Sequence, residues 1–419
     1  METTHSILVN TKNASKCLAV ADSKAKTNAL MFMADALLQN VHKIIEANKI
    51  DVQNASGTVS DVMIDRLMLD NKRIEAMADG MRQVAALPEP CGRVIKEYTR
   101  ADGLNIKKIS VPFGVVGIIY ESRPNVTSDA AAISIKSGNA CVLRCGKQAF
   151  YSANAIVEAL KQGLEQAQIN PDCIGLIKDT SRESANEMMT ANGLIDILIP
   201  RGGAGLINSC VKNATVPCIQ TGTGICHIYV DKDADIEKAI KITQNAKMSR
   251  PSVCNAAEVC LVHKDIAEEF LPKLKEVLVD IPNKNGDAFA EIRGTKEVCD
   301  IIDCTLAGDS DFDTEFLDYI MAVKIVDDVN EAVSHILNHG TGHSEAIVTQ
   351  NETTANVFCT MTDSAAVYVN SSTRFTDGGE FGLGCEMGIS TQKLHARGPM
   401  GIEELNTYKY VITGDGNIR

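Results

Sequence analysis

The stretch VVGIIYESRPNVTSDAAAISIKSGNACVL, residues 115–143, decides the fold. Its first six residues are apolar and predict a buried strand, while Thr127-Ser128-Asp129 begins a predicted helix over residues 127–137. Residues 140–143 predict the next strand. Apolar strands that alternate with helices are typical of a parallel sheet covered on both faces. The stretch therefore predicts a doubly wound α/β domain.

The same alternation continues on both sides of this stretch. It adds helices at 152–167, 182–191 and 204–213, and strands at 173–177 and 194–198. Upstream, apolar spacing predicts one long helix over 13–46 and a second over 60–86, followed by a hairpin or edge strand near 93–111. A second α/β domain is expected from residue 225, with strands at 226–230, 257–262, 321–326, 345–349 and 366–369. We therefore divide the chain into domains at 1–224 and 225–385 and a C-terminal segment at 386–419.

Composition excludes several classes of function. The formal net charge of −13 argues against nucleic-acid binding, which needs a basic face. No window is apolar enough to predict a membrane span, and the first residues show no secretory signal. The fourteen cysteines lack CxxC pairs and zinc-like spacing, so we expect no metal site and a reducing cytoplasm.

Loops that follow the strands are the places to seek a ligand, because ligands of doubly wound sheets lie beyond the carboxyl ends of the strands. Residues 199–205 (IPRGGAG) fit either a phosphate-binding turn at a helix N-terminus or a plain connecting turn. Arg144 and Lys147 follow another strand and suit an adenosine ribose or its 2′-phosphate, or a solvated turn. The stretch 221–224 (TGTG) is either a hinge or part of a cleft lining.

Cys254 stands apart from the other cysteines because its flanks are polar. It lies in the run SRPSVCNAAE, residues 249–258, between a predicted helix and a predicted strand. A cysteine in a polar turn beside an arginine can be a thiolate at neutral pH, whereas most free cysteines are inert core residues. No general base is evident beside it in the sequence. Cys254 is therefore the candidate nucleophile.

Four motifs together resemble one family. They are PFGVVGIIYESRPN at 112–125, KSGN at 136–139, the Cys254 turn and HARGPMG at 395–401. Over nearly the whole chain they are similar to the γ-glutamyl phosphate reductases of the aldehyde dehydrogenase superfamily. The resemblance implies an aldehyde-dehydrogenase-like fold, with a cofactor domain, an α/β catalytic domain and a small oligomerisation arm. It also implies NADPH-dependent reduction of L-glutamyl 5-phosphate to the semialdehyde, the second step of proline biosynthesis, with phosphate released through a Cys254 thioester.

The resemblance also implies roles for individual residues. An ungapped match places Arg123 where the superfamily has its oxyanion-binding asparagine, with Asn125 two residues later. Asn125 is therefore the candidate for that catalytic role, and Arg123 is a candidate substrate contact that could hold the departing phosphate. The implied cofactor contacts are Lys136, Arg144, Lys147, Gly202, Gly203 and Glu315, the last at the nicotinamide ribose. The implied substrate contacts are Arg250, Asn255 and Arg397.

Two further features follow from the same resemblance. Hydrolytic members carry a glutamate base in an ELGG motif where this chain has TGTG, so the thioester is expected to resist water. The segment near 95–110 and the tail after 400 resemble the oligomerisation arm, which implies a homo-oligomer. Two other functions stay open at this point: a CoA-acylating aldehyde dehydrogenase, and an inactive scaffold that assembles with a glutamate kinase.

Overall fold

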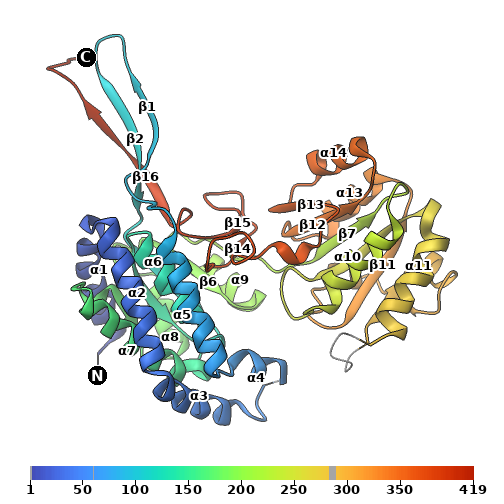
Figure 1. The fold of residues 1–419 in the computed structure, drawn as a ribbon, viewed down its shortest axis with the longest axis horizontal. Helices are drawn as coiled ribbons and strands as arrows, with labels where there is room; N and C mark the ends of the chain where they lie inside the picture. Colours follow the sequence, from blue (N-terminus) through green and yellow to red (C-terminus); the bar gives the residue numbers. More distant parts are fainter. Residues whose placement is uncertain (1, 60, 283–288) are drawn as a thin grey trace. The chain divides into compact units, whose positions relative to one another are not determined.

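The computed structural model describes residues 2–59, 61–282 and 289–419, and the chain forms two compact units (Figure 1). Unit 1 comprises Met1–Thr221, Gly382–Gly388 and Pro399–Arg419, and unit 2 comprises Gly222–Phe381 and Ile389–Gly398. The domain boundaries predicted after residues 224 and 385 lie near the divisions after Thr221 and Phe381. The C-terminal segment, however, is shared between the two units.

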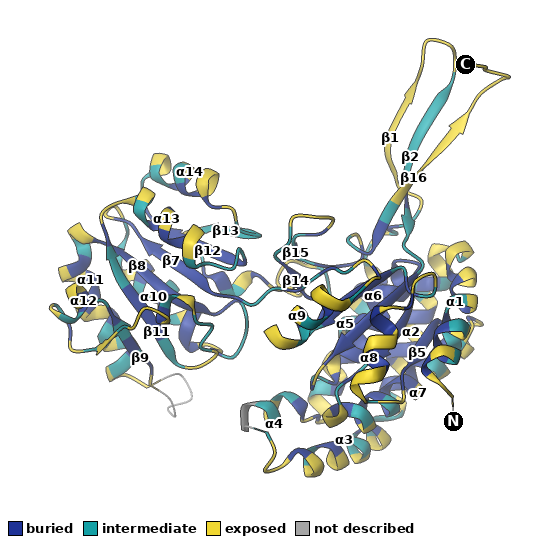
Figure 2. Cartoon of the chain, turned by 180° about the vertical axis from the view of Figure 1, so that it is seen from behind, coloured by how far each residue is buried: buried dark blue, intermediate teal, exposed yellow. Residues whose placement is uncertain are grey.

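Unit 1 is built on a sheet of four parallel strands in the order β5-β4-β3-β6. Every residue of the inner strand β3 is buried, as expected for an apolar strand covered on both faces. Helix α6 is rich in alanine, and all but two of its residues are buried (Figure 2). The strands are β3 (Val115–Tyr120), β4 (Ala140–Arg144), β5 (Ile174–Leu176) and β6 (Ile197–Arg201); the helices are α6 (Asn125–Lys136), α7 (Phe150–Gln166), α8 (Arg182–Met189) and α9 (Ala204–Asn213).

The N-terminal helices correct two predictions. The single helix expected over 13–46 is three helices. The Asp22 side chain accepts from the Ala25 N–H and starts the second helix, and the non-helical backbone of Asn40 separates the second from the third. The helix expected over 60–86 is likewise divided, because Asp70 caps a new helix through the Arg73 N–H; Ser60 itself lies outside the described residues. The bounds are α1 (Thr4–Val20), α2 (Ser23–Gln39), α3 (Val41–Ala55), α4 (Asp61–Leu67) and α5 (Asn71–Ala86). Apolar spacing continues across these breaks, so the spacing alone does not show where one helix ends and the next begins.

Unit 2 contains a seven-stranded parallel sheet in the order β10-β9-β11-β8-β7-β12-β13. The inner strands β7, β8 and β12 are entirely buried. Its strands are β7 (Cys226–Val230), β8 (Ala257–His263), β9 (Glu291–Gly294), β10 (Thr305–Leu306), β11 (Ile320–Val326), β12 (Ser344–Val348) and β13 (Ala366–Val369); its helices are α10 (Ile236–Met248), α11 (Ala267–Lys275), α12 (Lys296–Cys299), α13 (Val329–His339) and α14 (Glu352–Met361). Both units thus confirm the predicted α/β class.

A three-stranded antiparallel sheet projects from the body of unit 1 (Figure 1). It joins β1 (Val94–Thr99), β2 (Asn105–Pro112) and β16 (Asn406–Thr413), with Asn406 opposite Pro112 and Thr413 opposite Asn105. All of β1 and most of β16 are exposed, including Ile95, Tyr410 and Ile412 (Figure 2). This sheet corresponds to the segments that the sequence predicted as an arm.

The remaining elements are short. They are β14 (Ile389–Ser390), β15 (Gly398–Pro399), a π-helical turn η4 (Glu276–Asp280) and the 3-10 helices η1 (Lys147–Ala149), η2 (Pro171–Cys173), η3 (Lys264–Ile266), η5 (Asp311–Asp313) and η6 (Thr373–Phe375). Across the described residues, none of the helices has the length and apolar character that a membrane crossing requires.

Candidate active site

The Cys254 turn in unit 2 connects α10 to the buried strand β8. Cys254 is partly exposed, and its carbonyl oxygen accepts a bond from the Cys226 thiol at 3.2 Å. Gly224 passes so close that a Cβ at this position would lie 1.5 Å from the Cys254 carbonyl oxygen. Only glycine fits there, because both contacting groups are backbone and neither can rotate away. The last glycine of the TGTG stretch therefore packs directly against the candidate nucleophile.

Glu315 meets the same turn. Its Oε1 accepts the Gly224 N–H at 2.8 Å, so Gly224 lies between Glu315 and Cys254. The neighbouring segment is held by a hydrogen bond between Asp313 and His339 at 2.8 Å. The structure thus brings together two residues that the sequence assigned separately to catalysis and cofactor binding.

Asn255 is fixed by a segment far away in the sequence. Its side-chain amide donates to the carbonyl oxygens of Arg374, at 3.3 Å, and Thr376, at 2.9 Å. Its own carbonyl oxygen accepts from the Thr373 hydroxyl at 2.7 Å, and its Oδ1 accepts from the Arg374 guanidinium. Asn255 is 4% exposed. These bonds make Asn255 a brace for the turn, and they do not support its predicted contact with substrate.

Glu258, the carboxylate nearest to Cys254 in the sequence, points into the core. It is fully buried and forms an ion pair with Lys247 at 2.5 Å, and it also accepts from the Leu317 N–H at 3.3 Å. Burial raises the pKa of Glu258 to about 7, and the neighbouring Lys247 opposes that change. Because Glu258 is buried and paired with Lys247, this carboxylate is not placed to act as a base for Cys254, although it is close to it in the sequence.

The two arginines predicted for unit 2 differ in their surroundings. Arg250 is exposed within the Cys254 turn. Arg397 instead donates to a side-chain oxygen of Asp363 at 2.7 Å and to its carbonyl oxygen at 2.6 Å. With Lys393, it holds the pKa of Asp363 at about 2. Because its charge is met by this local carboxylate, the position of Arg397 does not support the predicted substrate contact.

In unit 1, three loops meet at the carboxyl edge of the four-stranded sheet, and Glu121 joins them. Its N–H donates to the Arg201 carbonyl at 3.3 Å and its carbonyl accepts from Gly146 at 3.1 Å. Its Oε2 accepts the Gly203 N–H at 3.1 Å. A Cβ on Gly202 would lie 2.6 Å from the Glu121 carboxyl carbon. Glu121 lies in the motif at 112–125, and no role was predicted for it.

The same edge carries groups that fit a dinucleotide. Helix α9 begins after Gly203, and a helix N-terminus with small residues suits a phosphate group. Lys147 is exposed in η1, just beyond β4. Arg144, at the end of β4, donates to the carbonyl oxygens of Thr180, at 2.7 Å, and Ser181, at 2.8 Å. Gly202, Gly203 and Lys147 therefore fit the cofactor prediction, whereas the described bonds of Arg144 support a neighbouring loop.

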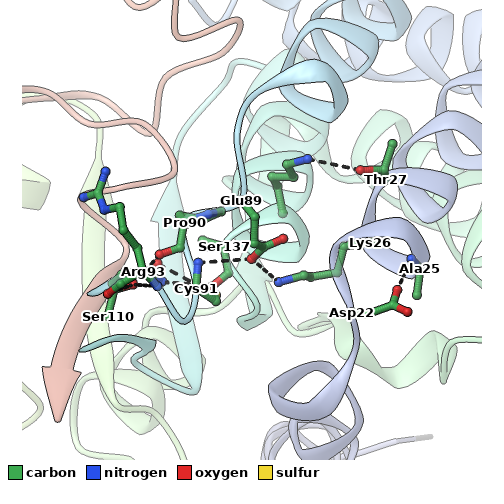
Figure 3. Close-up of polar contacts among 12 residues, drawn as sticks. Asp22, Ala25, Lys26, Thr27, Glu89, Pro90, Cys91, Arg93, Ser110 and Ser137 are labelled. Atoms are coloured by element: carbon green, nitrogen blue, oxygen red, sulfur yellow. Dashed lines mark hydrogen bonds and ion pairs between the residues drawn. The ribbon is translucent and has the colours of Figure 1, made fainter. Parts of the chain in front are cut away.

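The position of Lys136 does not support its predicted contact with the cofactor. It is 2% exposed, and its ammonium donates to the Ala85 carbonyl at 2.7 Å and the Thr27 hydroxyl at 3.1 Å. Beside it, Lys26 pairs with Glu89, which also accepts the Cys91 N–H at 3.0 Å (Figure 3). The ammonium of Lys136 thus packs helix α6 against α2 and α5.

Arg123 and Asn125 lie where β3 passes into α6, at the same edge as Glu121. The Asn125 amide donates to Asp129, one turn later in the helix, at 3.0 Å. Burial raises the pKa of Asp129 to about 6, and the bond from Asn125 opposes this change. In this structure Asn125 therefore contacts a carboxylate of its own helix.

Three comparisons with known proteins agree with one another. Residues 4–293 match the model of the aldehyde dehydrogenase family. The chain is 61% identical over 418 residues to the gamma-glutamyl phosphate reductase of Streptococcus suis, covering all of both chains. The crystal structure of the gamma-glutamyl phosphate reductase of Thermotoga maritima has a TM-score of 0.94 at 44% identity, again over all of both chains. An acetylating aldehyde dehydrogenase of Geobacillus thermoglucosidasius has a TM-score of 0.72 at 18% identity, covering 99% of this chain and 97% of its own, which shows the shared fold.

Proposed function

Because the chain belongs to the aldehyde dehydrogenase family, a family of nicotinamide-dependent oxidoreductases, we propose that it is the γ-glutamyl phosphate reductase of proline biosynthesis. In that role it reduces L-glutamyl 5-phosphate to L-glutamate 5-semialdehyde and releases phosphate. The observation that carries the proposal is the Cys254 turn, in which a partly exposed cysteine has its backbone packed against Gly224.

The chemistry at Cys254 begins with its thiolate. The sulfur attacks the acyl carbon of the substrate, a carbon–sulfur bond forms, and the carbon–oxygen bond to phosphate breaks with its electron pair on the phosphate oxygen. The Gly224 contact fixes the backbone of the nucleophile throughout. The TGTG stretch at 221–224 contains no carboxylate, which favours a thioester that is reduced and not hydrolysed.

The residues of the unit 1 edge fit NADPH. Gly203 and the N-terminus of α9 would bind a phosphate of the cofactor, and Lys147 would bind its 2′-phosphate. When bound, NADPH supplies the hydride that takes the thioester to the level of the aldehyde. Gly202 leaves room for the Glu121 side chain, since a Cβ there would lie 2.6 Å from the Glu121 carboxyl carbon.

We place the enzyme in the cytoplasm as a homo-oligomer. All fourteen cysteines are free thiols, which suits a reducing compartment. The exposed apolar residues on β1 and β16 suit pairing of the arm with a second copy. Delivery of the labile acyl phosphate by a glutamate kinase is compatible with this assignment.

The decisive experiment runs the reaction in reverse. Pyrroline-5-carboxylate, the cyclic form of the product, is supplied with NADP and inorganic phosphate, and formation of NADPH is followed by absorbance. We expect activity that requires phosphate and is not restored by CoA. Activity that requires CoA would instead establish an acylating dehydrogenase, and no activity with either would favour the scaffold role.

A further inference from the structure

Arg374 is a cation close to the nucleophile. Neither the sequence-based predictions nor the proposed mechanism gives it a role. It lies in η6 of unit 2, far from Cys254 in the chain. Its carbonyl oxygen and its guanidinium both bond to Asn255, the residue directly after the nucleophile. Its Nε donates to the Ser249 hydroxyl at 3.1 Å. One guanidinium therefore contacts both ends of the turn that carries Cys254.

These bonds fix the plane of the guanidinium. An arginine fork is rigid, and two of its nitrogens here are anchored on residues that bracket the turn. Asn255 is itself bonded to Thr373 and Thr376. The guanidinium of Arg374 is therefore positioned by a buried network of hydrogen bonds. A fixed planar fork suits the recognition of a phosphate or carboxylate by paired hydrogen bonds.

The charges around Arg374 indicate an anion as ligand. Burial and the nearby charge of Arg250 both lower its pKa, whereas Asp377 and the Cys254 thiol act in the opposite direction. Asp377 also accepts from the backbone N–H of Gly379 at 2.9 Å. The charge of the exposed Arg250 repels that of Arg374, and a dianion bound by both arginines would relieve that repulsion.

We propose that Arg374, with Arg250, binds the phosphate group of the acyl phosphate and stabilises it as it leaves. The inference rests on the proposed function and adds a residue that determines which leaving group the site accepts. The phosphate is bonded through one oxygen to the carbon that Cys254 attacks, so it must lie beside the sulfur. When the carbon–sulfur bond forms and the carbon–oxygen bond breaks, the electron pair left on the phosphate oxygen falls next to the guanidinium.

The test uses the full chain in the reverse direction with Arg374→Gln and Arg374→Lys. We expect Arg374→Gln to raise the KM for inorganic phosphate by about 30-fold or more, with the KM for pyrroline-5-carboxylate and for NADP changed by less than about 3-fold. Arg374→Lys keeps the charge without the fork, so we expect an intermediate rise of about 10-fold. Lys264→Gln, which removes an exposed cation paired with Asp327, should leave all three constants unchanged.

A second measurement does not depend on any variant being active. Inorganic phosphate should slow alkylation of Cys254 by iodoacetamide in the wild-type protein, followed by mass spectrometry, and this protection should weaken in Arg374→Lys. A rise in the KM for pyrroline-5-carboxylate with no rise for phosphate would overturn the proposal, because Arg374 would then bind the carboxylate. A fall in kcat with unchanged KM for phosphate and unchanged protection would also overturn it, because Arg374 would act only through Asn255. Failure of the wild-type protein to use phosphate would contradict the proposed function itself.

Discussion

The Cys254 turn of unit 2 and the strand-end loops of unit 1 both serve the proposed reaction, but they are held in different ways. At the Cys254 turn, backbone lies against backbone, and Asn255 ties the turn to residues more than a hundred positions away. At the edge of unit 1, one side chain, that of Glu121, fills the space over Gly202 and caps Gly203. A side chain can rotate away from a ligand, whereas packed backbone cannot. The nucleophile therefore sits in a rigid frame, and the cofactor loops can adjust.

The largest effect is expected from removing the nucleophile. Cys254→Ala should lower the rate of reduction by at least about 10³-fold while thermal stability stays near that of the wild type, because the thiol provides the covalent step. Initial rates and calorimetry would measure the two quantities. Cys359→Ala, which removes an exposed thiol on α14, is the matched control and should keep full activity. Substantial activity in the Cys254 variant would show that another group attacks the substrate.

The rigid frame itself can be tested at Gly224. Gly224→Ala would place a methyl group 1.5 Å from a backbone oxygen, so we expect a loss of about 3 kcal/mol in the free energy of unfolding and near-complete loss of activity. Gly202→Ala meets only the Glu121 carboxylate, so it should cost less than about 1 kcal/mol and mainly raise the KM for NADPH. Urea denaturation gives the comparison.

Gly308→Ala is the control for these variants, because its nearest neighbour would be 3.8 Å away. It should change stability by less than about 0.5 kcal/mol. Equal losses of stability for Gly224→Ala and Gly202→Ala would remove the distinction between a rigid and an adjustable region.

In unit 1, the partly buried Asp129 predicts a dependence of stability on pH. Its pKa is raised to about 6 by burial, so between about pH 4 and pH 6 the folded state keeps a proton that the unfolded chain has released. Stability of the wild type should therefore fall as the pH rises through this interval. Asp129→Asn removes the charge and should be more stable than the wild type by about 1–3 kcal/mol at pH 7.5.

The difference between the Asp129 variant and the wild type should shrink toward zero below about pH 4, as shown by urea denaturation at several pH values. A stability difference of the same size at pH 4 and pH 7.5 would show that burial does not raise the pKa of Asp129 in the folded state.

The smallest effect concerns the choice of cofactor. Lys147→Ala should raise the KM for NADPH by about 10-fold and that for NADH by less than about 3-fold, because only NADPH carries the 2′-phosphate. Arg144→Ala should weaken both cofactors similarly, since Arg144 supports the loop at Thr180 and Ser181. Titration with both cofactors would decide. A uniform loss in the Lys147 variant would refute the assignment of the 2′-phosphate.

Local patterns predicted the parallel sheet correctly, because the alternation around residues 115–143 lies within one short stretch. The polar flanks of Cys254 separated it from thirteen other cysteines, and its role as the nucleophile stays a prediction. The bonds of Lys136 do not support its predicted cofactor contact, because in the sequence a lysine beside a glycine turn looks the same whether it faces a ligand or two helices. Apolar spacing also predicted one N-terminal helix where there are three, because the spacing continued past the cap at Asp22.

By itself, the sequence determined the class of fold, the family and the candidate nucleophile, since periodicity and motifs are written within short stretches. Only the tertiary structure decided which groups surround that nucleophile. It placed Gly224 against Cys254, Glu315 against Gly224 and Arg374 against Asn255, and it gave the ammonium of Lys136 partners on two helices. The physical reason is distance along the chain. Hydrogen bonds and steric exclusion act between atoms that folding brings together, and no local pattern records which distant residue will be the partner.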